Sequence, residues 1–207
     1  MAKDWRASLR HSVIMKLAFT LAVGLVLAFL ALAIMQGQTR TGDEIPALRP
    51  RGSIIVGAEV DTVTSAESLV GYSLASPQDA PGDLELKSIR VQAETKTVYM
   101  VFARPSLTLP SELSWSWLLD NDCWVLVQSP QDSTVSPEKL IDDIVVQSGG
   151  RASRITVGGS PGLMYCPGDL DSAVHWWSGG IHYALITPRE TDYSDLVTFA
   201  EAIAAQM

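Results

Sequence analysis

Metal-binding and nucleophilic side chains are scarce in this chain of 207 residues, which contains two cysteines and three histidines. His11 precedes a long apolar run, whereas His175 and His182 lie close together far along the chain. A zinc site needs three or four ligands, and beside this pair only Cys166 offers a third in principle. A Walker A motif, a dinucleotide-binding fingerprint and a c-type haem motif are all missing. We therefore expect no metal, no cofactor and no catalytic residues.

Two short patterns resemble functional motifs but lack a required part. Gly158, Ser160 and Gly162 match the letters of the G-x-S-x-G nucleophile elbow, yet the residues after Ser160 favour a strand rather than a helix. Pro161 also removes an N–H that the oxyanion hole would use, so we expect a glycine turn. Carboxylates that could bind calcium lack EF-hand spacing, and we interpret them as solvated. They are Asp120, Asp122, Asp132, Asp142 and Asp143.

Basic residues are in the minority, with 15 Lys and Arg against 23 Asp and Glu and a formal net charge of −8. Residues 1–16 nevertheless carry +3, so the rest of the chain carries −11. Such an acidic chain argues against binding to nucleic acid and against docking on anionic lipid.

A long uncharged apolar run occupies residues 17–35 and extends back to residue 13. Nineteen residues of helix span about 28 Å, close to the hydrocarbon thickness of a bilayer. We predict an uncleaved transmembrane helix over 13–35; the alternative is a cleaved signal peptide, whose apolar region is usually shorter. Small residues near one helix face either pack against other membrane helices or face lipid. They are Ala22, Gly24, Ala28 and Ala31.

The positive charge before the apolar run orients the chain in the membrane. On the positive-inside rule, residues 1–16 form a cytoplasmic stub. Residues 36–52 are polar and contain Pro46 and Pro50, as a juxtamembrane linker would. The sequence therefore predicts an exported domain over 53–207, and a location in the cell membrane as a single-pass protein.

Both cysteines, Cys123 and Cys166, fall in the exported part. An oxidising compartment favours one disulfide between them, closing a loop of about 43 residues and contributing about 4 kcal/mol. The alternative is two separate buried thiols.

The pattern of apolar residues in the exported part favours strands over helices. We expect strands near 53–60, 84–93, 97–103, 113–119, 123–128, 153–159, 162–166, 173–177 and 181–186, with a bulge at Lys87–Ser88. Helices are predicted at 64–72, with a Thr64–Glu67 capping box, at 136–150 and at 194–207. Short turns join the strands, so the fold class is α+β: a mainly antiparallel sheet with helices on one face.

The stretch AVHWWSGGIHYALI, residues 173–186, raises the question of a histidine site. A two-residue turn at Gly179 and Gly180 suits a type I′ hairpin. That register places Trp177 opposite His182 and Trp176 opposite Tyr183, and offsets His175 diagonally from His182 on one face. We predict hairpin packing built on Trp176, Gly180 and Tyr183 rather than a metal site.

Two stretches resemble the small exported domain behind the membrane helix of bacterial anti-sigma-factor-like proteins. The opening match uses Leu69, Val70, Gly71, Tyr72, Leu74, Pro77, Pro81, Gly82 and Leu84; the closing match uses Trp176, Gly180, Tyr183, Leu196, Ala200 and Ile203. The resemblance covers most of 60–207 and implies an α+β sheet domain without enzymatic activity. Here only about 16 residues precede the membrane, without cysteine, so the stub does not sequester a sigma factor alone.

The function that fits these features is a non-enzymatic membrane protein whose exported domain binds a protein partner. A sensor or an accessory subunit of an envelope or membrane complex fits best. The alternative is a carrier of an apolar ligand such as a lipid, lined by Trp115, Trp117 and Trp124, unless these tryptophans belong to the core.

Overall fold

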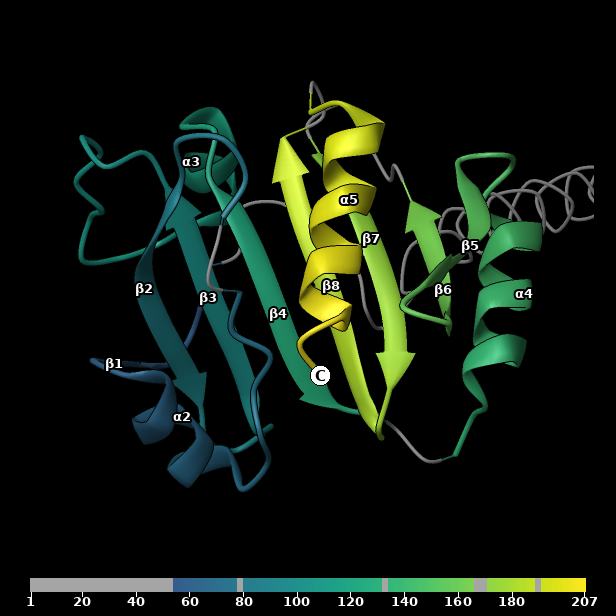
Figure 1. The fold of residues 1–207 in the computed structure, drawn as a ribbon, viewed down its shortest axis with the longest axis horizontal. Coiled ribbons are helices and arrows are strands. Elements are labelled where there is room, and N and C mark those ends of the chain that lie inside the picture. The colour runs from purple at the N-terminus through teal and green to yellow at the C-terminus, as the bar shows by residue number, and fades with distance from the viewer. Residues whose placement is uncertain (1–53, 78–79, 132–133, 166–170, 189–190) are drawn as a thin grey trace, which may run out of the picture. The chain divides into compact units, whose positions relative to one another are not determined.

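The computed structural model describes residues 54–207 except 78–79, 132–133, 166–170 and 189–190. These residues form an α+β domain with one eight-stranded antiparallel sheet and four helices (Figure 1). The predicted stub, membrane helix and linker lie outside the described residues. Within the described part, none of the helices combines the length and the apolar composition that a membrane span requires.

The sheet consists of two strand meanders joined at its centre, in the order β1-β2-β3-β4-β8-β7-β6-β5. The first contains β1 (Ala58–Val60), β2 (Glu85–Gln92), β3 (Thr97–Ala103) and β4 (Trp124–Pro130). The second contains β5 (Ala152–Val157), β6 (Ser160–Tyr165), β7 (Asp171–Ser178) and β8 (Ile181–Pro188). Pairing of β4 with β8, from Val125 opposite Ile186 to Pro130 opposite Ile181, unites them. The bulge predicted in β2 is confirmed by a register shift between Leu86 and Ser88.

Helices cover both faces of the sheet, so the expectation of helices on one face is wrong. The first face, here the α5 face, carries α2 (Val63–Val70) and α5 (Tyr193–Ala204) (Figure 1). The second, here the α3 face, carries α3 (Trp115–Asp120). Strand β3 is buried on both sides, with Met100 on the α5 face and Val101 on the α3 face. The apolar run of β3 predicted this two-sided burial, but the covering helix came from a segment assigned to a strand.

That segment, residues 113–119, forms α3 rather than a strand. Ser114 caps the helix, its hydroxyl accepting a hydrogen bond from the Trp117 N–H at 3.2 Å. Trp115, Leu118 and Leu119 are buried, at the i, i+3, i+4 spacing of a helix face. The apolar residues of this segment also alternate with the period of two that is typical of a strand. Packing against the sheet therefore decides between strand and helix.

The remaining helices follow the predicted pattern with one shift. Helix α4 (Pro137–Gln147) begins after Ser136, as predicted, and Gly149 follows its end with a φ of 62°. Helix α2 begins two residues earlier than the predicted capping box requires, because Thr62 rather than Thr64 is its N-cap. Glu67 therefore makes no capping box, and its carboxylate accepts from the Leu74 N–H at 2.9 Å.

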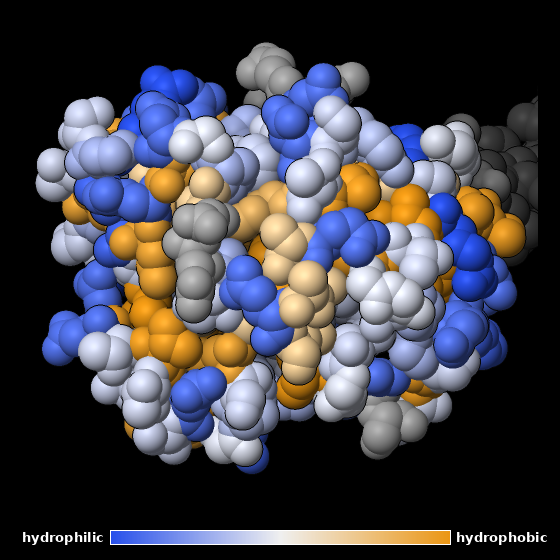
Figure 2. Space-filling view, in the orientation of Figure 1, coloured by the Kyte–Doolittle hydropathy of each residue, from blue (hydrophilic) through white to orange (hydrophobic). Residues whose placement is uncertain are grey.

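Apolar side chains reach the surface on the α5 face, at the end of the sheet that carries α2 and β2 (Figure 2). Leu69 of α2 and Leu86 of β2 are exposed there. Val60, Val63 and Leu84 are partly buried against the same core. We call this set of five residues the α2–β2 apolar surface.

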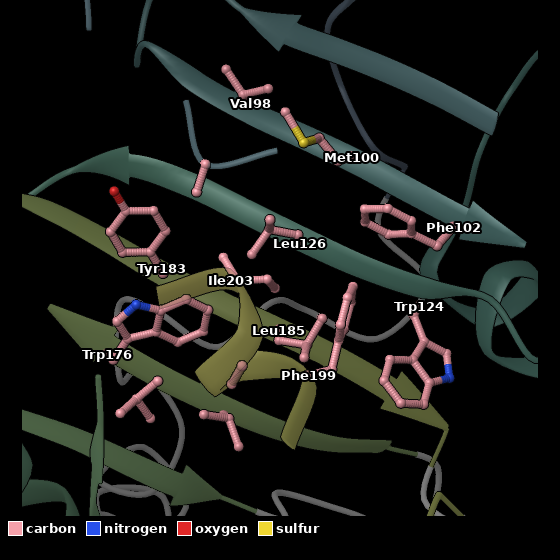
Figure 3. Close-up of a cluster of buried hydrophobic side chains, with 14 of the residues drawn as sticks. Val98, Met100, Phe102, Trp124, Leu126, Trp176, Tyr183, Leu185, Phe199 and Ile203 are labelled. Carbon is pink, nitrogen blue, oxygen red and sulfur yellow. The ribbon is translucent and has the colours of Figure 1, made fainter. Parts of the chain in front are cut away.

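The core of the α5 face is closed by the C-terminal helix. Leu196, Phe199, Ala200 and Ile203 point inward, as the sequence predicted. The Phe199 ring meets Phe102 and Trp124 edge-on, at centroid distances of 5.7 Å each (Figure 3). Helix α5 therefore fixes the centre of the sheet beneath it.

Candidate functional site

The β7–β8 hairpin forms as the sequence predicted. Its two-residue turn places Gly179 and Gly180 at φ values of 58° and 80°, which glycine adopts without strain. Trp177 lies opposite His182 and Trp176 opposite Tyr183. Because successive residues point to opposite faces, the hairpin presents one aromatic pair to each face of the sheet.

Trp176 and Tyr183 pack on the α5 face, where their rings stack at 5.0 Å with an angle of 10° (Figure 3). Trp176 is fully buried, and burial raises the pKa of Tyr183. The predicted hairpin packing is therefore present: Trp176 and Tyr183 belong to the core, and Gly180 forms the exposed turn.

His175 and His182 contact each other on the α3 face. His175 Nδ1 lies 3.1 Å from His182 Nε2, within hydrogen-bonding distance. The ring planes differ by only 4° and the centroids are 5.3 Å apart. This separation is accounted for by the N–N distance plus the two ring radii, so the rings lie end to end in one plane rather than one above the other. One ring donates the proton that the other accepts.

Trp177 stacks on the face of His182, with centroids 4.8 Å apart and an angle of 19°. Burial lowers the pKa of His182 to about 4, so this ring is neutral at neutral pH. Trp177, His175 and His182 thus form one connected unit, which we call the histidine–tryptophan cluster.

The surroundings of the cluster are mainly apolar. Leu163 of β6 and Ala184 of β8 flank His175 in the strand registers, and Ser129 of β4 lies opposite His182. Beyond Leu163, Arg154 of β5 pairs with Asp142 of α4. Among the described residues, no three His, Cys, Asp or Glu side chains gather as metal ligands would. The arrangement suits proton sharing between two imidazoles rather than nucleophilic chemistry.

A second polar site, not anticipated from the sequence, lies on the α5 face. Gln128 of β4 is fully buried, and its side-chain amide both donates to the Ala75 carbonyl and accepts from the Ala75 N–H, each at 2.9 Å. The Tyr72 hydroxyl lies 2.9 Å from the Gln128 and Lys96 carbonyls, and it can donate to either. These bonds hold the chain after α2 against the sheet.

The other candidate residues occupy structural positions. Ser160 begins strand β6, which excludes the helix that a nucleophile elbow requires. Asp120 ends α3, Asp122 pairs with Arg104, and Asp143 pairs with Lys139. Asp132 lies outside the described residues.

The three candidate ligand-lining tryptophans do not share one concavity. Trp124 packs on the α5 face, whereas Trp115 packs on the α3 face with Trp117 against the same cluster.

Cys123 is a buried thiol at the start of β4. Its Sγ lies 3.7 Å from the Asn121 carbonyl, and burial, with a contribution from Asp122, raises the thiol pKa to about 11. Cys166 lies outside the described residues, so its pairing with Cys123 stays a prediction.

Comparison of the chain with protein-family models, with curated proteins and with solved structures finds no match.

Proposed function

We propose that the protein is a non-enzymatic, single-pass membrane protein whose exported domain binds a protein partner. Its role is that of a sensor or an accessory subunit of an envelope or membrane complex. The contrast within the chain carries this proposal: an uncharged run at 17–35, preceded by net positive charge, leads into an acidic α+β domain. The resemblance to the exported domain of anti-sigma-factor-like proteins points the same way.

Surface and site chemistry support binding rather than catalysis. Within the α2–β2 apolar surface, the Leu69 side chain is 53% exposed. Exposed apolar side chains of this kind are available for contact with a protein partner. The two described histidines bond each other, within packed side chains.

Topology is tested on intact cells expressing the chain with a C-terminal tag. We expect externally added protease to remove the tag, and N-terminal sequencing to begin upstream of residue 13. A tag that survives while an accessible control protein is digested contradicts the exported domain. Sequencing that begins after Met35 indicates a cleaved leader and contradicts the anchor.

Partner binding is tested by extraction in mild detergent, affinity capture and mass spectrometry. We expect a stoichiometric protein partner, lost in Leu69→Asp. The matched control is Val146→Asp on α4, which replaces a side chain that is 82% exposed away from this surface. Recovery of the protein alone with bound lipid contradicts the proposal and supports the carrier.

A further inference from the structure

Strand β5 forms one end of the sheet, and its outer edge has no neighbouring strand in the described part of the chain (Figure 1). The turn into β6 consists of Gly158 and Gly159, with φ values of 56° and 79°, as in a type I′ turn. The pair of residues that flanks such a turn is hydrogen-bonded. Counting back from this pair, the odd-numbered residues of β5 bond to β6. The even-numbered residues therefore direct their backbone N–H and C=O groups outward.

The outward N–H groups at the two ends of this edge are satisfied within the domain. The Ala152 N–H donates to the hydroxyl of the residue that caps the end of α4, at 3.1 Å. The Gly158 N–H donates to the Glu201 carboxylate of α5, at 2.8 Å. Between them, Arg154 and Thr156 are exposed, and their outward backbone groups meet no partner among the residues that the structure describes. The middle of the edge can therefore pair with one more strand.

Strand β5 lacks the features that usually keep an edge unpaired, which are a proline, a bulge or an uncompensated charge. Its register with β6 is continuous from Ala152 to Val157, and it contains no proline. Its one charged side chain, Arg154, pairs with Asp142 of α4. Helix α4 contacts both β5 and β6, so it covers a face of the sheet and leaves the edge open.

We infer that β5 pairs with β5 of a second copy of the chain, antiparallel and about a two-fold axis at Ile155, so that two domains share one continuous sheet. The inference concerns the domain itself and does not depend on the proposed function. The α2–β2 apolar surface lies toward the opposite end of the sheet, so it stays accessible in both copies.

The groups that are available at the edge select the register. With the axis at Ile155, Arg154 of each copy lies opposite Thr156 of the other, and both residues exchange their outward N–H and C=O groups. Moving the axis to Arg154 would place two guanidinium groups directly opposite each other, which is unfavourable. Moving it to Thr156 would require the Gly158 N–H, which Glu201 already binds.

The side chains fit the same register. Ile155 is partly buried against the core of the α5 face. At the axis it meets its own copy in a non-hydrogen-bonded pair, where cross-strand side chains are closest. Each α4 lies over two strands spaced about 4.8 Å apart, so the two copies of α4 are about 10 Å apart, a normal distance for packed helices.

Opposite charges at the two ends of the edge favour a second copy over an unrelated strand. Arg151 lies just before β5, Glu201 binds the turn just after it, and both side chains are exposed. An antiparallel copy reverses the order of these ends. It therefore brings Arg151 of each copy toward Glu201 of the other, on both sides of the axis.

Cross-linking of the full-length chain in detergent tests this contact under mild oxidation. Residues in a non-hydrogen-bonded antiparallel pair have Cα atoms about 4.5 Å apart, so Ile155→Cys should form an intermolecular disulfide. The unchanged chain, which contains Cys123 and Cys166, gives the background. Val146→Cys, at a side chain of α4 that is 82% exposed, is the matched control and should run as a monomer on a non-reducing gel. Equal cross-linking of the two variants overturns the inference.

Sedimentation of the same detergent-solubilised chain measures the association itself. We expect the wild type to be a dimer. Thr156→Pro removes an outward N–H from an edge strand, where proline is tolerated, and its urea unfolding shows whether the domain is folded. The dissociation constant should rise about tenfold or more, because the dimer loses a hydrogen bond from each copy. A monomeric wild type overturns the inference, and so does a dimer that Thr156→Pro leaves unchanged, because that dimer is held elsewhere. The cross-link at Ile155 is independent of how Thr156→Pro folds.

Discussion

Gln128 shows how one buried polar side chain fixes a connection far away in sequence. Its amide satisfies both the N–H and the C=O of Ala75, 53 positions earlier. We expect Gln128→Leu to lower the free energy of unfolding by about 2–4 kcal/mol, because both backbone groups lose their partner. Tyr72→Phe removes only a hydroxyl and should cost about 1 kcal/mol. Urea unfolding of the full-length chain in detergent measures both; equal effects would contradict the clamp.

Gly158 and Gly159 occupy the β5–β6 turn but differ in what surrounds them. A Cβ at Gly158 would lie 2.5 Å from the Ala204 Cβ of α5, whereas one at Gly159 would meet nothing within 4 Å. Both have positive φ, so alanine at either position carries a similar backbone strain of about 1–2 kcal/mol. We expect Gly158→Ala to be less stable than Gly159→Ala by a further 1–3 kcal/mol or so, from overpacking against α5. Matching thermal midpoints would show that α5 does not press on this turn.

Cross-strand partners were predictable from the sequence where the turn was short. Two glycines fixed the register of β7 and β8, so the pairs Trp176–Tyr183 and Trp177–His182 followed. The direct bond between His175 and His182 did not follow, because it depends on ring rotations set by packing. The hydrogen bonds of Gln128 were equally unpredictable from the sequence, since their backbone partner, Ala75, lies in a different part of the chain.

At the scale of elements, α3 depends strongly on its N-cap because it is only six residues long. We expect Ser114→Ala to lower the free energy of unfolding by about 1 kcal/mol, since the Trp117 N–H loses its acceptor. Ser114→Asp restores an acceptor at the helix start and should keep wild-type stability. Chemical denaturation compares the two, and a Ser114→Asp variant as unstable as Ser114→Ala would contradict the cap.

The elements that sequence reasoning located best had capping residues or a single period. Ser136 and Pro137 marked the start of α4, and the spacing of Leu196, Phe199 and Ile203 marked the inner face of α5. Residues 113–119 satisfied the periods of strand and helix together. Whether they form a strand or a helix depends on how they pack against the apolar surface of β3 and β4. A local sequence pattern carries no information about that surface.

At the scale of the whole molecule, the predicted disulfide links distant parts of the sheet. Strands β7 and β8 lie between the end of β6 and the start of β4, so a bond requires the segment after Tyr165 to cross both. We expect non-reducing peptide mass spectrometry to recover Cys123 joined to Cys166, and reduction to cost about 4 kcal/mol of stability. Alkylation is done in denaturant, because the buried Cys123 thiol with a pKa of about 11 resists it when folded. Two alkylated cysteines without prior reduction would favour separate thiols.

The fold class was predictable, and the distribution of helices over the sheet was not. Antiparallel pairing followed from many strands joined by short turns. The face that a helix covers is decided by the side of the sheet over which its connecting segments pass. Strand β3 is apolar on both faces, so its sequence is compatible with a helix on either one. The end-to-end order of strands, with β8 beside β4, likewise has no local signal.

The position of β8 sets the order in which the domain can be completed. The β3 partner of β4 precedes it in the chain, whereas the partner of its other edge is absent until residues 181–188 have been synthesised. Until then the growing chain consists of two half-sheets, and the open edge of β4 carries Val125, Leu126 and Val127. A ribosome that stalls before Ile181 thus leaves an aggregation-prone intermediate with this edge of β4 unpaired.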